Sequence, residues 1–132
     1  MAGNLGPIGM TNGLTPFGMT IASGTSATVI QLTTQPTQLC AVSAGSIAAV
    51  ARWLKFFDSA NAIEPGAAAL FQMIIPGNVA GAGSNLHVSQ GPPIISGLQF
   101  NSGLAFAVTA NNAISDASGI SGPDVTVLLG YR

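Results

Sequence analysis

Few side chains in this sequence could carry acid–base, nucleophilic or metal chemistry. They comprise one histidine, one cysteine and four carboxylates: His87, Cys40, Asp58, Glu64, Asp116 and Asp124. General acid–base catalysis and tetrahedral metal sites each need several such groups close together, and no second histidine or cysteine completes a set. No Gly-x-Ser-x-Gly motif occurs either. We therefore expect no catalytic residues, no bound metal and no cofactor.

Two weaker patterns involve the same groups. Asp116 and Asp124 flank a glycine-containing loop that could hold calcium through carbonyl oxygens, but two widely spaced acids indicate such a site only weakly. Cys40 lies in an apolar segment and is interpreted as a small buried hydrophobe, and His87 as a surface or structural histidine. Spacing alone does not exclude a Cys–His catalytic pair, although no motif flanks either residue.

The chain carries very little charge. Only 5% of its 132 residues are charged, against about 25% in ordinary globular domains, and residues 1–51 contain none. Three basic residues cannot neutralise a run of phosphates or bind an anionic bilayer, so neither nucleic acid nor membrane is an expected partner. The longest apolar stretch, residues 39–51, is shorter than the about 20 residues that span a bilayer. With no recognisable secretory signal, synthesis in the cytoplasm is expected.

Glycine and proline dominate residues 1–26, between single large apolar residues. This composition cannot sustain a helix and predicts an extended N-terminal arm, separate from a domain at 27–132. A flexible tail is the alternative. The apolar residues favour an arm that lies on neighbouring subunits, since a solvated linker would carry polar residues instead. The interface candidates in the arm are Leu5, Ile8, Met10, Leu14, Phe17 and Met19.

The remaining sequence reads as short strands separated by Gly, Pro, Asn or Ser. Helix is a weak competitor at 43–54 and 62–70, because Gly45 and the pair Pro65-Gly66 break those patterns. The expected fold class is all-β, a single β-sandwich or jelly-roll-like domain of about eight strands. The expected strands cover residues 27–32, 37–43, 50–57, 69–75, 85–88, 94–100, 104–109 and 125–131.

One of these strands holds most of the basic charge. In an extended segment Arg52, Leu54 and Phe56 share one face, while the other face carries three further large side chains, Trp53, Lys55 and Phe57. A strand that is apolar on both sides predicts burial against the core on one face and against a partner on the other, so Arg52, Trp53, Lys55 and Phe57 are interface candidates. The alternative is a central strand whose basic side chains reach water along apolar stems.

The surface of such a domain must be built from Ser, Thr, Asn, Gln, Gly and Ala. Because such a surface carries so little charge, electrostatic repulsion between copies of the protein is weak. It also packs against other subunits without costly desolvation of charge. The composition therefore indicates an assembly subunit.

Four segments form a recognisable series. They are Ala51–Asp58 (ARWLKFFD), Ala67–Pro76 (ending Ile-Ile-Pro), Gly97–Thr109 (GLQFNSGLAFAVT) and Asp124–Tyr131 (DVTVLLGY). In order and spacing this series, within residues 37–132, resembles small structural proteins of tailed bacteriophages. The resemblance implies an all-β virion protein, and some of these proteins look like capsid decoration (cement) proteins. The resemblance does not include the arm, and it implies no catalytic residues.

Together these observations predict a capsid decoration protein that binds the major capsid protein on the assembled head as a homo-oligomer, preferably a homotrimer. It would be made in the host cytoplasm and reside on the capsid surface of the virion. A neck, tail or fibre-base adaptor would fit the same features. A carbohydrate-binding β-sandwich module is a further alternative, with Trp53 and Tyr131 as platforms. An enzyme is the least favoured class.

Overall fold

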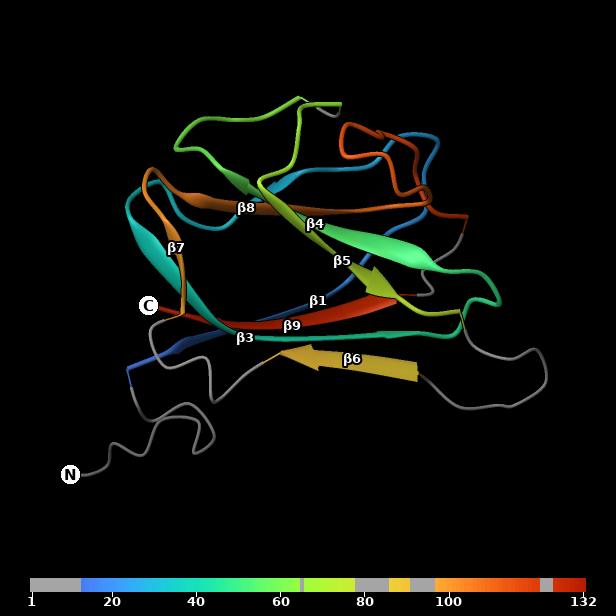
Figure 1. Cartoon of the computed structure of the whole chain (residues 1–132), viewed down its shortest axis with the longest axis horizontal. Coiled ribbons are helices and arrows are strands. Elements are labelled where there is room, and N and C mark those ends of the chain that lie inside the picture. Colours follow the sequence, from blue (N-terminus) through green and yellow to red (C-terminus); the bar gives the residue numbers. More distant parts are fainter. Residues whose placement is uncertain (1–12, 65, 78–85, 91–96, 122–124) are drawn as a thin grey trace.

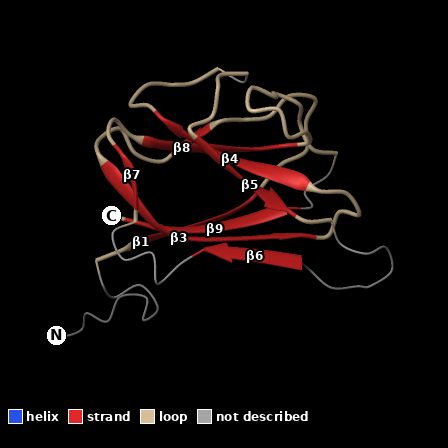
Figure 2. Cartoon of the chain, in the orientation of Figure 1, coloured by secondary structure: helices blue, strands red, loops and turns tan. Residues whose placement is uncertain are grey.

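A computed structural model describes residues 13–64, 66–77, 86–90, 97–121 and 125–132, with residues 86–90 as backbone only. These residues form strands and loops, and no helix occurs among them (Figure 2). The strands are β1 (Thr15–Thr20), β2 (Ile30–Gln31), β3 (Thr37–Ser46), β4 (Arg52–Asp58), β5 (Phe71–Ile75), β6 (Leu86–Gln90), β7 (Leu98–Phe100), β8 (Leu104–Thr109) and β9 (Val125–Tyr131).

The strands form two antiparallel sheets that face each other (Figure 1). One sheet has the order β1-β9-β3-β6 and the other β2-β8-β4-β5. Strand β7 pairs with β3 at Thr37–Leu39 and β6 pairs with it at Val42–Ser46, on the edge opposite β9. The two therefore share one strand position, which leaves eight positions in the order of a jelly roll. The all-β jelly-roll expectation is confirmed.

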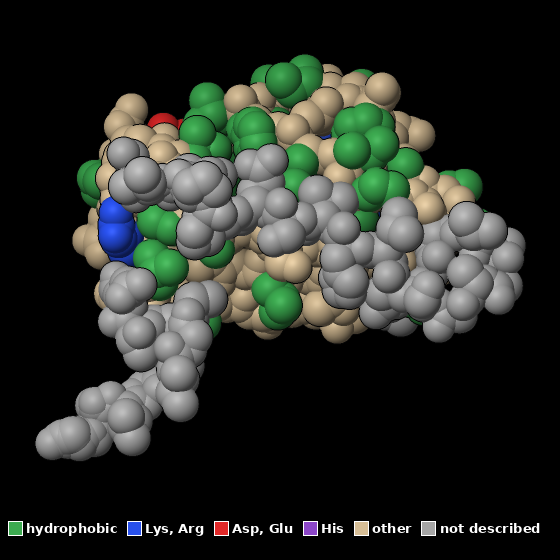
Figure 3. Space-filling model, turned by 60° about the horizontal axis from the view of Figure 1, so that its bottom comes forward, with side chains coloured by type: hydrophobic (Ala, Val, Ile, Leu, Met, Phe, Trp, Pro, Cys, Tyr) green, Lys and Arg blue, Asp and Glu red, His purple; other side chains and the backbone are tan. Residues whose placement is uncertain are grey.

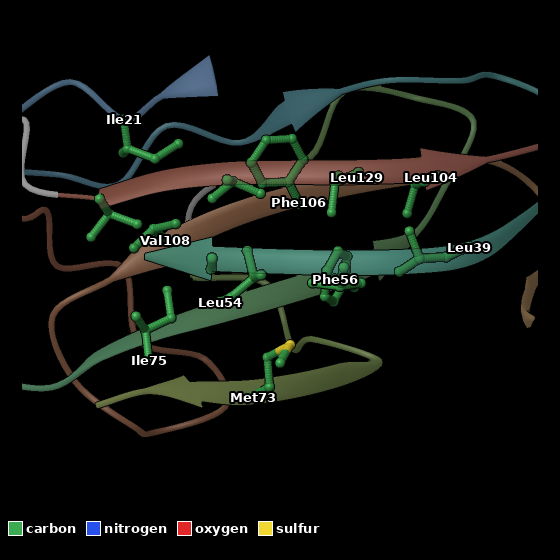
Figure 4. Packing of buried hydrophobic residues seen from close by; sticks show 14 of the residues in the cluster. Ile21, Leu39, Leu54, Phe56, Met73, Ile75, Leu104, Phe106, Val108 and Leu129 are labelled. Atoms are coloured by element: carbon green, nitrogen blue, oxygen red, sulfur yellow. The ribbon is translucent and has the colours of Figure 1, made fainter. Parts of the chain in front are cut away.

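The core lies between the sheets and follows from two-residue alternation. In β9, Val125, Val127 and Leu129 are buried, while Thr126 and Leu128 are exposed. From the facing sheet, large apolar side chains of β4, β5 and β8 meet them (Figure 4). Burying each such side chain contributes about 1.5–3 kcal/mol, so this layer holds the sheets together.

Strand β3 departs from simple alternation at Cys40. Leu39 lies opposite Tyr131 of β9 and Ala41 opposite Gly130, so Cys40 has no register partner. Such a bulge inserts one residue and reverses which side chains point inward. Leu39 and Val42, three residues apart, consequently both enter the core.

The arm expected over residues 1–26 needs correction in its second half. Thr15–Thr20 form β1, an edge strand paired along its length with β9. Phe17 and Met19 pack against the core, Ile21 is buried, and the ring of Phe17 meets Phe106 edge-on at 5.8 Å. The apolar residues at alternate positions form the inner face of a strand, and Pro16 and Gly18 between them obscured that pattern. Residues 1–12, with Leu5, Ile8 and Met10, lie outside the described residues.

A second cluster lies on the outer face of the β2-β8-β4-β5 sheet. Phe57 of β4 packs there with Ala105 and Ala107 of β8, under the loops that contribute Ala27 and Ala69. Figure 1 shows these loops lying over β8 and β4. The second apolar face of β4 is therefore covered by the chain itself.

Candidate functional site

Lys55 lies on that covered face of β4 and is fully buried. Its ammonium donates hydrogen bonds to the backbone carbonyls of Ala113 and Asp116, in the loop between β8 and β9. Burial lowers the pKa of Lys55, and the nearby charge of Asp116 acts in the opposite direction. Lys55 therefore holds the loop between β8 and β9 against β4, and its charge is not exposed at the surface.

Asp116 organises the same loop. Its carboxylate accepts the backbone N–H of Asn111 at 3.3 Å, the backbone N–H of Ser118 at 3.2 Å and the Ser118 hydroxyl. Burial alone would raise the pKa of Asp116, but the hydrogen bonds from Ser118 and Asn111 outweigh it and lower the pKa. A carboxylate engaged in this way is a weak candidate for the calcium loop considered above, whose second acid, Asp124, lies outside the described residues.

Asp58 at the end of β4 holds the turn between β7 and β8. Its two carboxylate oxygens accept the backbone N–H groups of Asn101, Ser102 and Gly103 at 2.8–3.3 Å. The hydrogen bond from Ser102 contributes most to lowering the pKa of Asp58, and those from Asn101 and Gly103 act in the same direction. This acid serves the fold.

The predicted interface residues of β4 mostly lie inside the domain. Arg52 is buried and donates a hydrogen bond to the Ser121 hydroxyl at 3.3 Å, and Phe57 belongs to the second cluster. Only Trp53 keeps a partly exposed side chain. An interface role for this set stays a prediction, and in the structure Arg52, Lys55 and Phe57 contact loops and strand β8 of the same chain.

The charged side chains that the structure describes are few and differ in exposure, with Arg52 and Lys55 buried and Asp58 and Asp116 half-buried. Among the charged residues that the structure describes, Glu64 and Arg132 are exposed, and Arg132 donates a hydrogen bond to the Gln38 side chain at 2.9 Å. On the face in Figure 3, blue and red cover very little of the surface outside the grey atoms.

The outer side of the β1-β9-β3 part of the sheet is made of small, uncharged residues. Leu128 is 51% exposed and lies between Gly18 of β1 and Ser43 of β3 in the register, and Thr126 lies opposite Thr20. We call Gly18, Thr20, Ser43, Thr126 and Leu128 the small-residue face. The sequence signal for such a face is the alternation in residues 125–129, which the sequence analysis did not use, and its extent depends on β1.

A second accessible surface follows β5, an edge strand with no partner beyond it among the described residues. Leu70 and Ile74 are 56% and 43% exposed, and Ile114, in the loop next to Leu70, is 51% exposed. The backbone hydrogen bond from Ala69 to the Ile114 carbonyl, 3.2 Å long, holds the two loops together. We call Leu70, Ile74 and Ile114 the apolar stripe. Sequence reasoning missed it because Ile114 lies in a loop far along the sequence from Leu70 and Ile74.

An apolar pocket of about 180 Å³ opens at the side of the sandwich. Residues of β3, β5 and the start of β7 line it: Leu39, Cys40, Ala41, Val42, Phe71, Met73, Gly97 and Leu98. Cys40 is buried, as its apolar surroundings predicted. His87 belongs to β6, where its backbone lies opposite Gly45.

Within the part of the chain that the structure describes, no group of three or more His, Cys, Asp or Glu residues is placed to hold a metal ion. No helix in that part is long and apolar enough to cross a membrane.

No protein-family model matches this chain, and the comparison with curated proteins finds no match. Among solved structures, the chain is similar to the coat protein of Tobacco streak virus, with 9% sequence identity and a TM-score of 0.37. The match covers 90% of this chain and 87% of that one. The jelly-roll assignment rests on the strand order and not on this similarity.

Proposed function

We propose that this chain is a virion structural protein, a capsid decoration protein that binds the assembled head as a homo-oligomer, with the homotrimer as the preferred state. The observation that carries the proposal is that most charged side chains serve to hold the fold together. Lys55 and Arg52 are buried, and Asp58 and Asp116 hold loops through backbone N–H groups. What remains outside is a mostly neutral surface, suited to packing against other subunits.

The small-residue face is our candidate for contact with the major capsid protein. Its hydroxyl, glycine and leucine groups carry no charge, so another subunit can pack against them without desolvating charge. The apolar stripe along β5 is our candidate for contact between copies, because a free strand edge beside exposed Leu70 and Ile74 is a surface that proteins normally cover.

Stabilisation by such a protein follows from mass action. A subunit that binds the assembled shell but not the free capsid protein lowers the free energy of the assembled state. The jelly roll supports this role by analogy only, since the same architecture occurs in viral capsid domains, lectins and cupins. The four-segment resemblance to small phage virion proteins points to the first of these.

The test is the copy number of this chain in purified virions, measured by quantitative peptide mass spectrometry against the major capsid protein. A simple ratio to the capsid protein is the expected result. A few copies per particle would support a neck, tail or fibre-base adaptor. Absence from the particle would overturn the virion proposal.

The geometry gives less support to a carbohydrate-binding module. Trp53 lies in β4 and Tyr131 in β9, on opposite sheets, and the half-buried Tyr131 packs against the core. The two rings therefore do not form one stacking platform.

A further inference from the structure

The pocket at the side of the sandwich has a size and chemistry that restrict what could occupy it. Sites for metabolite-sized ligands usually have volumes of about 300–1,000 Å³ and include a few polar groups that orient the ligand. This pocket measures about 180 Å³, and its lining is apolar apart from the Cys40 thiol and backbone. It matches one or two large apolar side chains.

We propose that the N-terminal segment of the same chain, residues 1–12, docks here and inserts an apolar side chain. The segment has no charged side chain, and its large apolar residues are Leu5, Ile8 and Met10. It is joined to Thr15, the first residue of β1. In the register, Thr15 lies opposite Tyr131, Tyr131 opposite Leu39, and Leu39 opposite Leu98 of the pocket.

This register places the origin of the arm at the same end of the sheet as the pocket. Three strand spacings of about 4.8 Å put Thr15 and Leu98 about 14 Å apart. Extended chain covers about 3.3 Å per residue, so Met10 reaches the pocket and Ile8 does so with slack for the path around the sheet end. So short a tether gives a high effective concentration, which favours docking within one subunit.

Cys40, the only cysteine, lines the pocket and reports on its occupant. We would prepare Ile8→Cys in the full chain and follow disulfide formation with Cys40 under mild oxidation, by non-reducing electrophoresis and peptide mapping. Leu5→Cys and Met10→Cys define the register of insertion. Ser23→Cys, exposed but fixed within the described domain, is the control that should not react.

A matched variant separates docking from random collision of a tethered thiol. Ile8→Cys with Leu5→Ser and Met10→Ser keeps the tether but removes its apolar side chains. We expect its intramolecular disulfide to form up to about tenfold more slowly, because the loss of buried apolar area weakens docking of the segment. Equal rates in the two variants would overturn the proposal.

A second measurement needs no added cysteine. Deleting residues 1–12 should make Cys40 react several-fold faster with a small thiol reagent. Unchanged shielding would overturn the proposal and leave residues 91–96, between β6 and β7, as the cover. Covalent dimers in place of an intramolecular disulfide would also overturn it, since a second copy would then supply the arm. All of these results are obtained on the isolated protein and are independent of the proposed virion role.

Discussion

The carboxylate of Asp58 ties the end of β4 to the β7–β8 turn, and its hydrogen bonds have a consequence for stability against pH. Because the folded state holds the pKa of Asp58 below its ordinary value of 3.8, the ionised group stabilises the fold above that value. This contribution is lost as the pH falls through the depressed folded pKa.

We predict that Asp58→Asn lowers the free energy of unfolding by roughly 1–2 kcal/mol at neutral pH, because up to three N–H groups lose a charged acceptor. The difference from the native chain should shrink below about pH 3.8. Urea denaturation at a series of pH values measures it, with the exposed Glu64→Gln as control. A difference that does not change with pH would contradict the role of the charge.

Lys55 offers a test of what a buried ammonium contributes. Lys55→Ala removes the stem and leaves the Ala113 carbonyl without its donor, so we predict a loss of about 2–4 kcal/mol. Lys55→Met also removes the donor to Ala113 but keeps the stem's volume and avoids burying a charge, so we predict a smaller loss of about 1–2 kcal/mol. Denaturant unfolding compares them. Equal losses would show that packing of the stem contributes little.

At the scale of elements, β1 makes residues 13–20 part of the domain. Deleting residues 1–12 removes only the docked apolar side chain proposed above, so the melting temperature should fall by no more than a few degrees. Deleting residues 1–20 removes Phe17 and Met19 from the core and exposes the edge of β9, so the melting temperature should fall by about 10 °C or more. Thermal unfolding followed by circular dichroism tests both deletions. Equal melting temperatures would mean that β1 adds little to the fold.

A glycine contact between two loops gives a second test at this scale. The N–H of Gly119 donates to the carbonyl of Thr25, and a Cβ at 119 would overlap the backbone oxygen of Gly24. Gly119→Ala should therefore cost about 1–3 kcal/mol, since neither backbone can easily move. Ala117→Ser in the same loop is the control. A stable Gly119→Ala chain would show that the loops over the second cluster are free to shift.

Two-residue alternation was enough to predict the fold class and most strands. Leu104–Thr109 and Val125–Tyr131 have the bounds expected from sequence. Strand β1 was missed because Pro16 and Gly18 hide the alternation, and the bulge at Cys40 changes parity in a way that periodicity cannot show. What covers the second apolar face of β4 could not be predicted from sequence, because the loops that cover it lie next to β4 only in the folded chain.

At the scale of the whole molecule, the sequence could not show which of the predicted interface residues remain accessible in the fold. Five of the predicted interface residues pack within the domain: Phe17, Met19, Arg52, Lys55 and Phe57. The surfaces that remain accessible, the small-residue face and the apolar stripe, combine residues from strands and loops far apart in the sequence. Each holds exposed apolar side chains at which a single added charge can be tested.

We predict that Ile74→Lys in the apolar stripe dissociates the homo-oligomer, because each copy would bring a positive charge into a contact that is now uncharged. Leu128→Lys on the small-residue face should leave the oligomer intact and weaken its binding to assembled heads. Both sites are about half exposed, so neither change should lower the melting temperature much. Sedimentation velocity and co-sedimentation with heads measure the two effects. If Leu128→Lys dissociates the oligomer while Ile74→Lys prevents head binding, the two surfaces exchange roles; if neither variant changes either measurement, the proposed surfaces are wrong.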